Sequence, residues 1–65
     1  MVYFQINKNQ NNYAHPYWWV VKSSGNHQVL ATSEMYVRKQ DAISAINLVK
    51  SGASGASVYD NTGEA

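Results

Sequence analysis

The sequence predicts an α+β domain in the order β-β-β-α-β, with an antiparallel sheet and one helix packed on one face. Three observations predict this fold. Residues 2–7 and 17–22 are rich in β-branched and aromatic side chains, as strands are. Residues 23–27 then carry a Gly-Asn reversal that leads into a third strand. Between residues 39 and 51 the apolar period changes to that of an amphipathic helix.

The first two strands are expected to form a hairpin with one apolar face. Phe4 and Ile6 alternate with polar neighbours, which is the pattern of a half-buried strand. Residues 7–12 supply the turn, because Asn side chains hydrogen-bond their own backbone and tolerate left-handed conformations. In the second strand, Trp19 and Val21 lie two residues apart and therefore share a face. These four apolar side chains are predicted core residues.

The third strand and the helix complete the predicted core. Residues 28–34 return as a strand, and the helix follows. Ala42, Ile46 and Val49 recur at the spacing of one helical face, so we expect them to pack against the sheet. Gly52 is a natural residue to end the helix.

The last predicted strand lacks an obvious place in the sheet. The Gly-Ala-Ser-Gly connector after the helix is short, so it restricts which sheet edge the strand can reach. Exchange of this strand with a second copy of the chain solves this problem and produces a homodimer. Residues 1–60 are expected to form one domain, followed by a flexible polar tail at residues 61–65. The candidate exchanged residues are Ser57, Val58 and Tyr59.

Composition excludes several classes of protein. The chain has 65 residues, enough for one domain with a small core, and such cores often gain stability by oligomerising. It has no cysteine, which excludes a disulfide scaffold and Cys-based zinc sites. Its net charge is +1 without a basic cluster, which disfavours nucleic acid as a partner. No apolar run is long enough to span a bilayer, so we expect a cytoplasmic protein that binds no membrane.

No catalytic, cofactor or metal site is expected. His15 and His27 lie in separate predicted loops, and zinc needs at least three convergent ligands. Ser33, Ser51 and Asp60 offer groups for hydrolysis, but the chain contains no G-x-S-x-G motif. The histidines are interpreted as solvated loop residues, and the combination of serines with Asp60 as a coincidence in a small chain with many serines.

The second strand also has a candidate partner surface. Alternation places Trp18, Val20 and Lys22 on the face opposite Trp19, and Tyr3 of the first strand joins them there. An exposed aromatic patch on a sheet is a plausible surface for a partner. The alternative is that a second copy of the chain covers it. The sequence therefore favours a non-catalytic homodimeric module that binds another macromolecule through its open sheet face or its rim. Single-stranded nucleic-acid binding through exposed sheet aromatics is the alternative function, and a small hydrolase is the third.

Four segments of the chain resemble one family. NHQVLATSEMY (26–36) looks like the "NGqvIatSegY" segment of the YegP-like domain, a small bacterial and archaeal module with no assigned activity. YWWVVKSS (17–24) is similar to its aromatic strand, and VRKQDAISAINLVKSGA (37–53) to its helix. SVYD (57–60) matches its closing strand.

The resemblance implies a β-β-β-α unit followed by a further strand, which is exchanged between two copies in a homodimer. It also draws attention to Glu34 and Tyr36, which match the family's S-E-x-Y pattern. We expect these two residues to satisfy backbone donors at the start of the helix. The sequence departs from the family's pattern in several places. Most notably, Trp18 stands where the family commonly has a charged or polar residue. In addition, His27 replaces the family's glycine, and Arg38 replaces the serine that would cap the helix.

Overall fold

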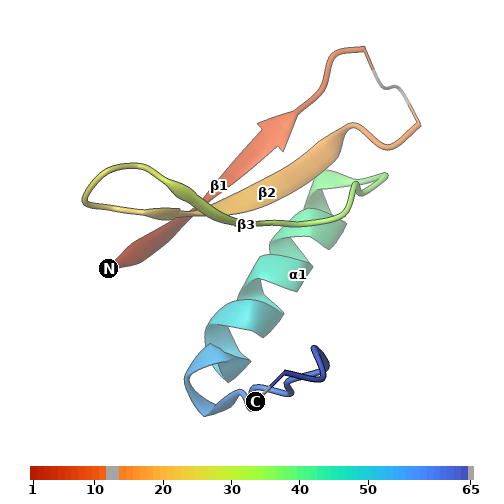
Figure 1. Cartoon of the computed structure of the whole chain (residues 1–65). Coiled ribbons are helices and arrows are strands. Elements are labelled where there is room, and N and C mark those ends of the chain that lie inside the picture. Colours follow the sequence, from red (N-terminus) through yellow and green to blue (C-terminus); the bar gives the residue numbers. More distant parts are fainter. Residues whose placement is uncertain (12–13, 65) are drawn as a thin grey trace.

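The computed structural model describes residues 1–11 and 14–64, so the end of the predicted 7–12 loop and residue 65 lie outside it. It has a three-stranded antiparallel sheet followed by one helix, which confirms the predicted α+β class (Figure 1). The elements are β1 (Val2–Lys8), β2 (Tyr17–Ser23), β3 (Val29–Thr32), α1 (Lys39–Gly52) and a 3₁₀ turn, η1 (Ala53–Gly55).

The sheet has the strand order β1-β2-β3, with β2 in the centre. Phe4 pairs with Val21 and Ile6 pairs with Trp19, so the predicted apolar face of the hairpin is continuous across both strands. The β2–β3 register shifts at Val21 and Lys22, which marks a bulge. All four residues of β3 are exposed, so this strand is a short, open edge of the sheet.

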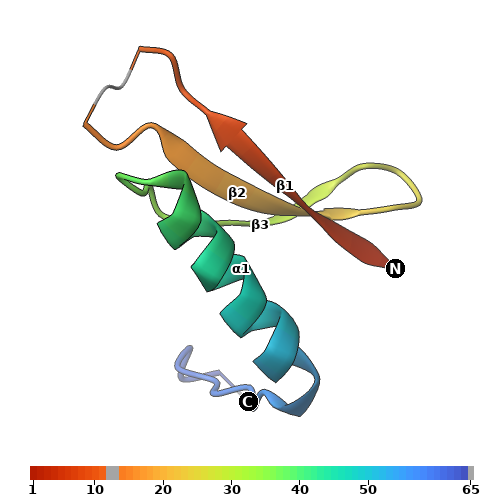
Figure 2. The ribbon, with the colours of Figure 1, turned by 180° about the vertical axis from the view of Figure 1, so that it is seen from behind.

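The core forms where α1 crosses one face of the sheet (Figure 2). Ala42 is fully buried, and Ile46 and Trp19 are each 8% exposed. The Phe4 ring meets the Trp19 ring edge-on, with centroids 5.5 Å apart, a favourable aromatic geometry. Phe4, Ile6 and Val21 pack around this cluster, as expected from their alternation.

The start of α1 lacks a side-chain cap, as the Arg38 departure predicts. Arg38 occupies the cap position without a capping hydrogen bond and pairs instead with Asp41, at 3.3 Å. The expected role of Glu34 and Tyr36 at the helix start is wrong. The Tyr36 backbone bridges Tyr17 through two hydrogen bonds, so it extends the sheet, and the Glu34 carbonyl accepts a bond from the Ser33 hydroxyl.

Val49 was expected in the core but is 37% exposed. Figures 1 and 2 show that α1 diverges from the sheet toward its C-terminal end, and Val49 borders a hollow there together with Val2 and Val21 of the sheet. The helix ends at Gly52 as predicted, but η1 continues the turn where a flexible connector was expected.

The segment expected to form the last strand is not paired within this chain. No strand is assigned to residues 56–60. Val58 is 94% exposed and Tyr59 is 84% exposed, so neither packs on the sheet or the helix of its own chain. Ala56 has extended backbone angles, which suit a strand.

Candidate partner-binding surfaces

The sheet face away from α1 is the first candidate surface. The β1–β2 register places three pairs there: Tyr3 with Lys22, Gln5 with Val20, and Asn7 with Trp18. We call this surface the open face. Its side chains are held by local contacts, such as the 2.9 Å hydrogen bond from the Gln5 amide to the Asn7 carbonyl oxygen.

Three of the four predicted surface residues lie on the open face at partial exposure, and the fourth is buried. Tyr3, Trp18 and Lys22 are half-buried. Val20 is only 7% exposed, which corrects the expectation that it offers contact area. It lies in the central strand between Gln5 and Thr32, so neighbours on both sides cover it. Val20 is therefore a packing residue beneath the open face.

The β2–β3 turn brings a histidine to one end of the open face. The Tyr3 hydroxyl lies 2.8 Å from His27 Nδ1, and their rings meet edge-on. His27 has a φ of 58°, the left-handed conformation for which glycine is best suited. This turn therefore adopts at His27 a backbone conformation that glycine would adopt without strain. Sequence reasoning missed this contact because it spans 24 residues.

The groups considered for hydrolysis hold turns together. The Ser33 hydroxyl accepts a hydrogen bond from the Trp19 backbone N–H and donates one to the Glu34 carbonyl. The Ser51 hydroxyl donates to the Leu48 carbonyl. Within the described residues, no three His, Asp or Glu side chains gather in a way that could hold a metal ion.

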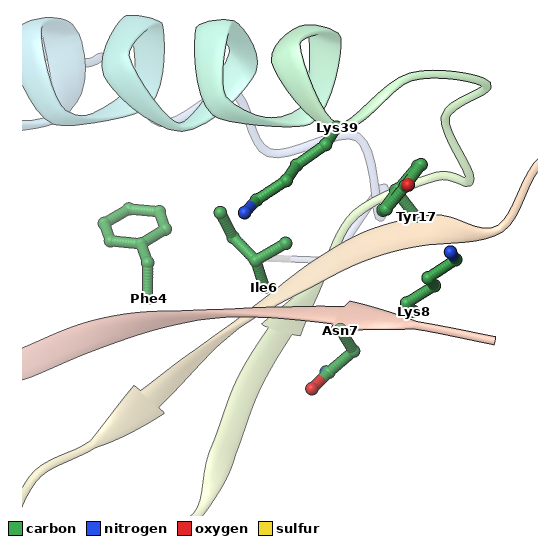
Figure 3. Close-up of a pocket in the computed structure, with 6 residues that line it drawn as sticks. All are labelled: Phe4, Ile6, Asn7, Lys8, Tyr17 and Lys39. Carbon is green, nitrogen blue, oxygen red and sulfur yellow. The ribbon is translucent and has the colours of Figure 1, made fainter. Parts of the chain in front are cut away.

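The second candidate surface lies on the helix side of β1. A pocket of about 560 Å³ opens between β1 and the start of α1. Phe4 and Ile6 form its floor, while Lys39 reaches over Ile6 from the helix (Figure 3). The Lys8 ammonium group lies 5.6 Å from the centroid of the Tyr17 ring, a cation–π geometry. We call this site the lysine pocket.

A second hollow of about 630 Å³ continues along the same strand. It lies where α1 diverges from the sheet, and Phe4 borders both hollows. We call it the apolar groove. It is lined by Val2, Tyr3, Phe4, Val21, Ile46, Val49, Lys50 and Ala53.

The electrostatics of the lysine pocket are unbalanced. Its lining contains two lysines and no acidic residue. In the part of the chain that the structure describes, the ion pair is between Arg38 and Asp41, and neither Lys8 nor Lys39 has one. Sequence reasoning overlooked this site because the lysines are 31 positions apart and line the same pocket only when α1 lies over β1.

Asp60 is an anionic group on the exposed C-terminal segment. Its carboxylate accepts hydrogen bonds from the Thr62 hydroxyl at 2.7 Å and from the Thr62 backbone N–H at 2.9 Å. Both bonds favour the charged form and lower the pKa of Asp60 from its ordinary value of 3.8. Asp60 is therefore ionised at neutral pH.

Comparison with known proteins identifies the family of the chain. Residues 16–60 match the model of a family described as Domain of unknown function (DUF1508), which is the same domain family as the YegP-like domain. No match is found among the curated proteins or the solved structures. Among the described residues, no helix has the length and apolar character needed to cross a membrane. The match covers more than half of the sequence, from β2 through the helix to Asp60, and the chain therefore belongs to the DUF1508 family.

Proposed function

We propose that this chain is a non-catalytic homodimeric module that binds another macromolecule through the open face of its sheet. One observation carries the binding role: no described element covers the open face, which presents Tyr3, Trp18 and Lys22 on one rigid sheet. Exposed patches with aromatic side chains are typical of partner sites. The chain is proposed to act in the cytoplasm.

Two features support the homodimer. The outer edge of β1 is unpaired in the described chain, and the lysine pocket and the apolar groove lie beside it. Residues 57–59 are exposed and carry the large apolar side chains that follow the helix. A strand from a second copy would pair with the edge of β1 and fill both hollows.

Light scattering at micromolar concentration tests the homodimer directly. One chain has a mass of 7.3 kDa, and we expect light scattering to give twice this value. A mass that stays at one chain across this concentration range would overturn the homodimer.

The binding role is tested with surface variants in pull-down experiments. Trp18→Ala should lose partners that the unaltered protein retains, because it removes the largest ring from the open face. Leu48→Ala is the matched control, since Leu48 is 74% exposed on the helix, away from the sheet. Equal recovery of all partners by both variants would argue against the open face.

Single-stranded nucleic acid is the second candidate partner. The favouring observation is that Tyr3 and Trp18 lie on the same face, about 13 Å apart along the strand direction, with Lys22 beside Tyr3. Bases stack on such rings, but the net charge of +1 gives little attraction for phosphate. Titration with oligonucleotides at low salt should quench tryptophan fluorescence, and an unchanged spectrum would remove this candidate.

A further inference from the structure

The lysine pocket and the C-terminal segment are complementary in charge and in apolar character. The pocket has an apolar floor of Phe4 and Ile6 beneath two lysines that have no acidic partner in the described chain. The exposed segment presents Val58 and, two residues later, the ionised Asp60. Val58 and Asp60 are two positions apart in the sequence, so their side chains point to the same face of a strand.

The same alternation determines where the side chains of a strand paired with β1 would lie. If Val58 faces the helix side and packs against Phe4, then Asp60 reaches the helix side one pleat further on. It meets the lysines only if the strand runs in the direction of β1, because Lys8 is at the C-terminal end of β1. In the opposite direction Asp60 would meet the apolar groove, where the cation is Lys50.

We propose that residues 56–60 of a second copy lie parallel to β1, with Val58 against Phe4 and Asp60 held between Lys8 and Lys39. This inference rests on the proposed homodimer and adds the direction, the register and the charged contact of the exchanged strand. The lysine pocket is then a site that each copy completes with a residue of the other. Tyr59 then points to the opposite side. It adds an aromatic side chain to the open face, where Tyr3 of β1 and Trp18 of β2 already lie.

Charge reversal with mixing of variants tests the contact. Lys8→Glu/Lys39→Glu and Asp60→Lys each place like charges together in both sites of a homodimer, so each should raise the dimer Kd by about tenfold or more. In a mixed dimer both sites are complementary again, since reversed lysines meet a reversed acid and native lysines meet a native acid. Mixing the two variants should therefore restore dimers to about the native affinity, measured by sedimentation equilibrium.

Matched variants control for overall charge and for direction. Lys22→Glu/Lys50→Glu carries the same change in charge as the double lysine variant, and Glu64→Lys carries the same change as Asp60→Lys. Glu64→Lys should not weaken the dimer, and Lys22→Glu/Lys50→Glu should weaken it less than the double lysine variant, because Lys50 borders the apolar groove but does not meet Asp60. Mixing each control with the opposite test variant should not restore native affinity. If the Lys50 variant weakens the dimer and the Lys8/Lys39 variant does not, the strand runs the other way and the proposal is wrong.

The remaining outcomes separate this inference from the homodimer itself. A native protein that is monomeric overturns both. A dimer whose Kd is unchanged by every reversal keeps the homodimer and overturns the lysine contact. If the mixture fails but a single chain carrying all three reversals regains native stability, the segment docks on its own chain. Asp60→Asn provides the milder test should a reversal prevent folding.

Discussion

At the scale of single residues, His27 is the clearest case of a local conflict between sequence and structure. Its left-handed backbone is unfavourable for any side chain with a Cβ atom, yet the turn requires this conformation. The bond between His27 and the Tyr3 hydroxyl offsets part of that cost by tying the turn to β1.

Two substitutions separate the backbone effect from the ring. His27→Gly and His27→Ala both remove the bond to Tyr3, but only alanine keeps the backbone cost. We expect the alanine variant to be less stable than the glycine variant by about 1 kcal/mol, measured by urea unfolding. Equal stabilities would show that the turn relaxes out of the left-handed region.

Thr62 controls the ionisation of Asp60. Thr62→Val removes the hydroxyl that donates to the carboxylate, so the pKa of Asp60 should rise toward 3.8. Because the native pKa is lowered, the stabilising contribution of the charged form is present above the unfolded-state pKa and is lost as pH falls through the native value. An NMR titration of the Asp60 carboxyl in both proteins measures the shift, and identical titration curves would contradict the role of Thr62.

At the scale of elements, α1 is held to the sheet by a small number of buried side chains. Ile46→Ala should reduce the free energy of unfolding by about 2–5 kcal/mol, because it empties part of the contact between helix and sheet. Leu48→Ala removes similar atoms from an exposed position of the same helix and should change stability little. Thermal unfolding compares them, and equal losses would mean that the helix buries a different face in solution.

The elements also show what the sequence determines. Periodicity predicted β1, β2 and α1 closely, because each carries a strong apolar pattern that burial in the core enforces. It failed for Val49, whose spacing fits the helical face but which borders the apolar groove, where α1 diverges from the sheet. It also failed for Val20, since alternation assigns a face but not the neighbours that cover a central strand. The presence of Lys8 and Lys39 in one pocket was not predictable, because it depends on how helix and sheet cross.

At the scale of the whole molecule, the C-terminal segment is central to the proposed assembly. Deleting residues 56–65 should abolish the dimer and promote aggregation, since it leaves the edge of β1 and both hollows exposed. Deleting only residues 61–65 should leave the dimer intact, because residues 61–64 are polar or small and exposed. Sedimentation velocity of the two truncations beside the full chain provides the comparison. A folded dimer that survives the longer deletion would place the interface elsewhere, most simply on the open face with Trp18.

The short, bulged strand β3 has a consequence for how far assembly can proceed. Once a donated strand covers β1, one edge of the sheet is the donated segment of residues 56–60. The other edge is β3, which is four residues long and whose ladder is interrupted by the register shift beside Lys22. A template of this length offers few main-chain bonds to an incoming strand, and its bulge twists those bonds out of line. Growth by edge-to-edge stacking into fibres is thereby discouraged. In a reciprocal pair, both edges of each sheet are therefore short strands, which favours a finite dimer over an extended fibre.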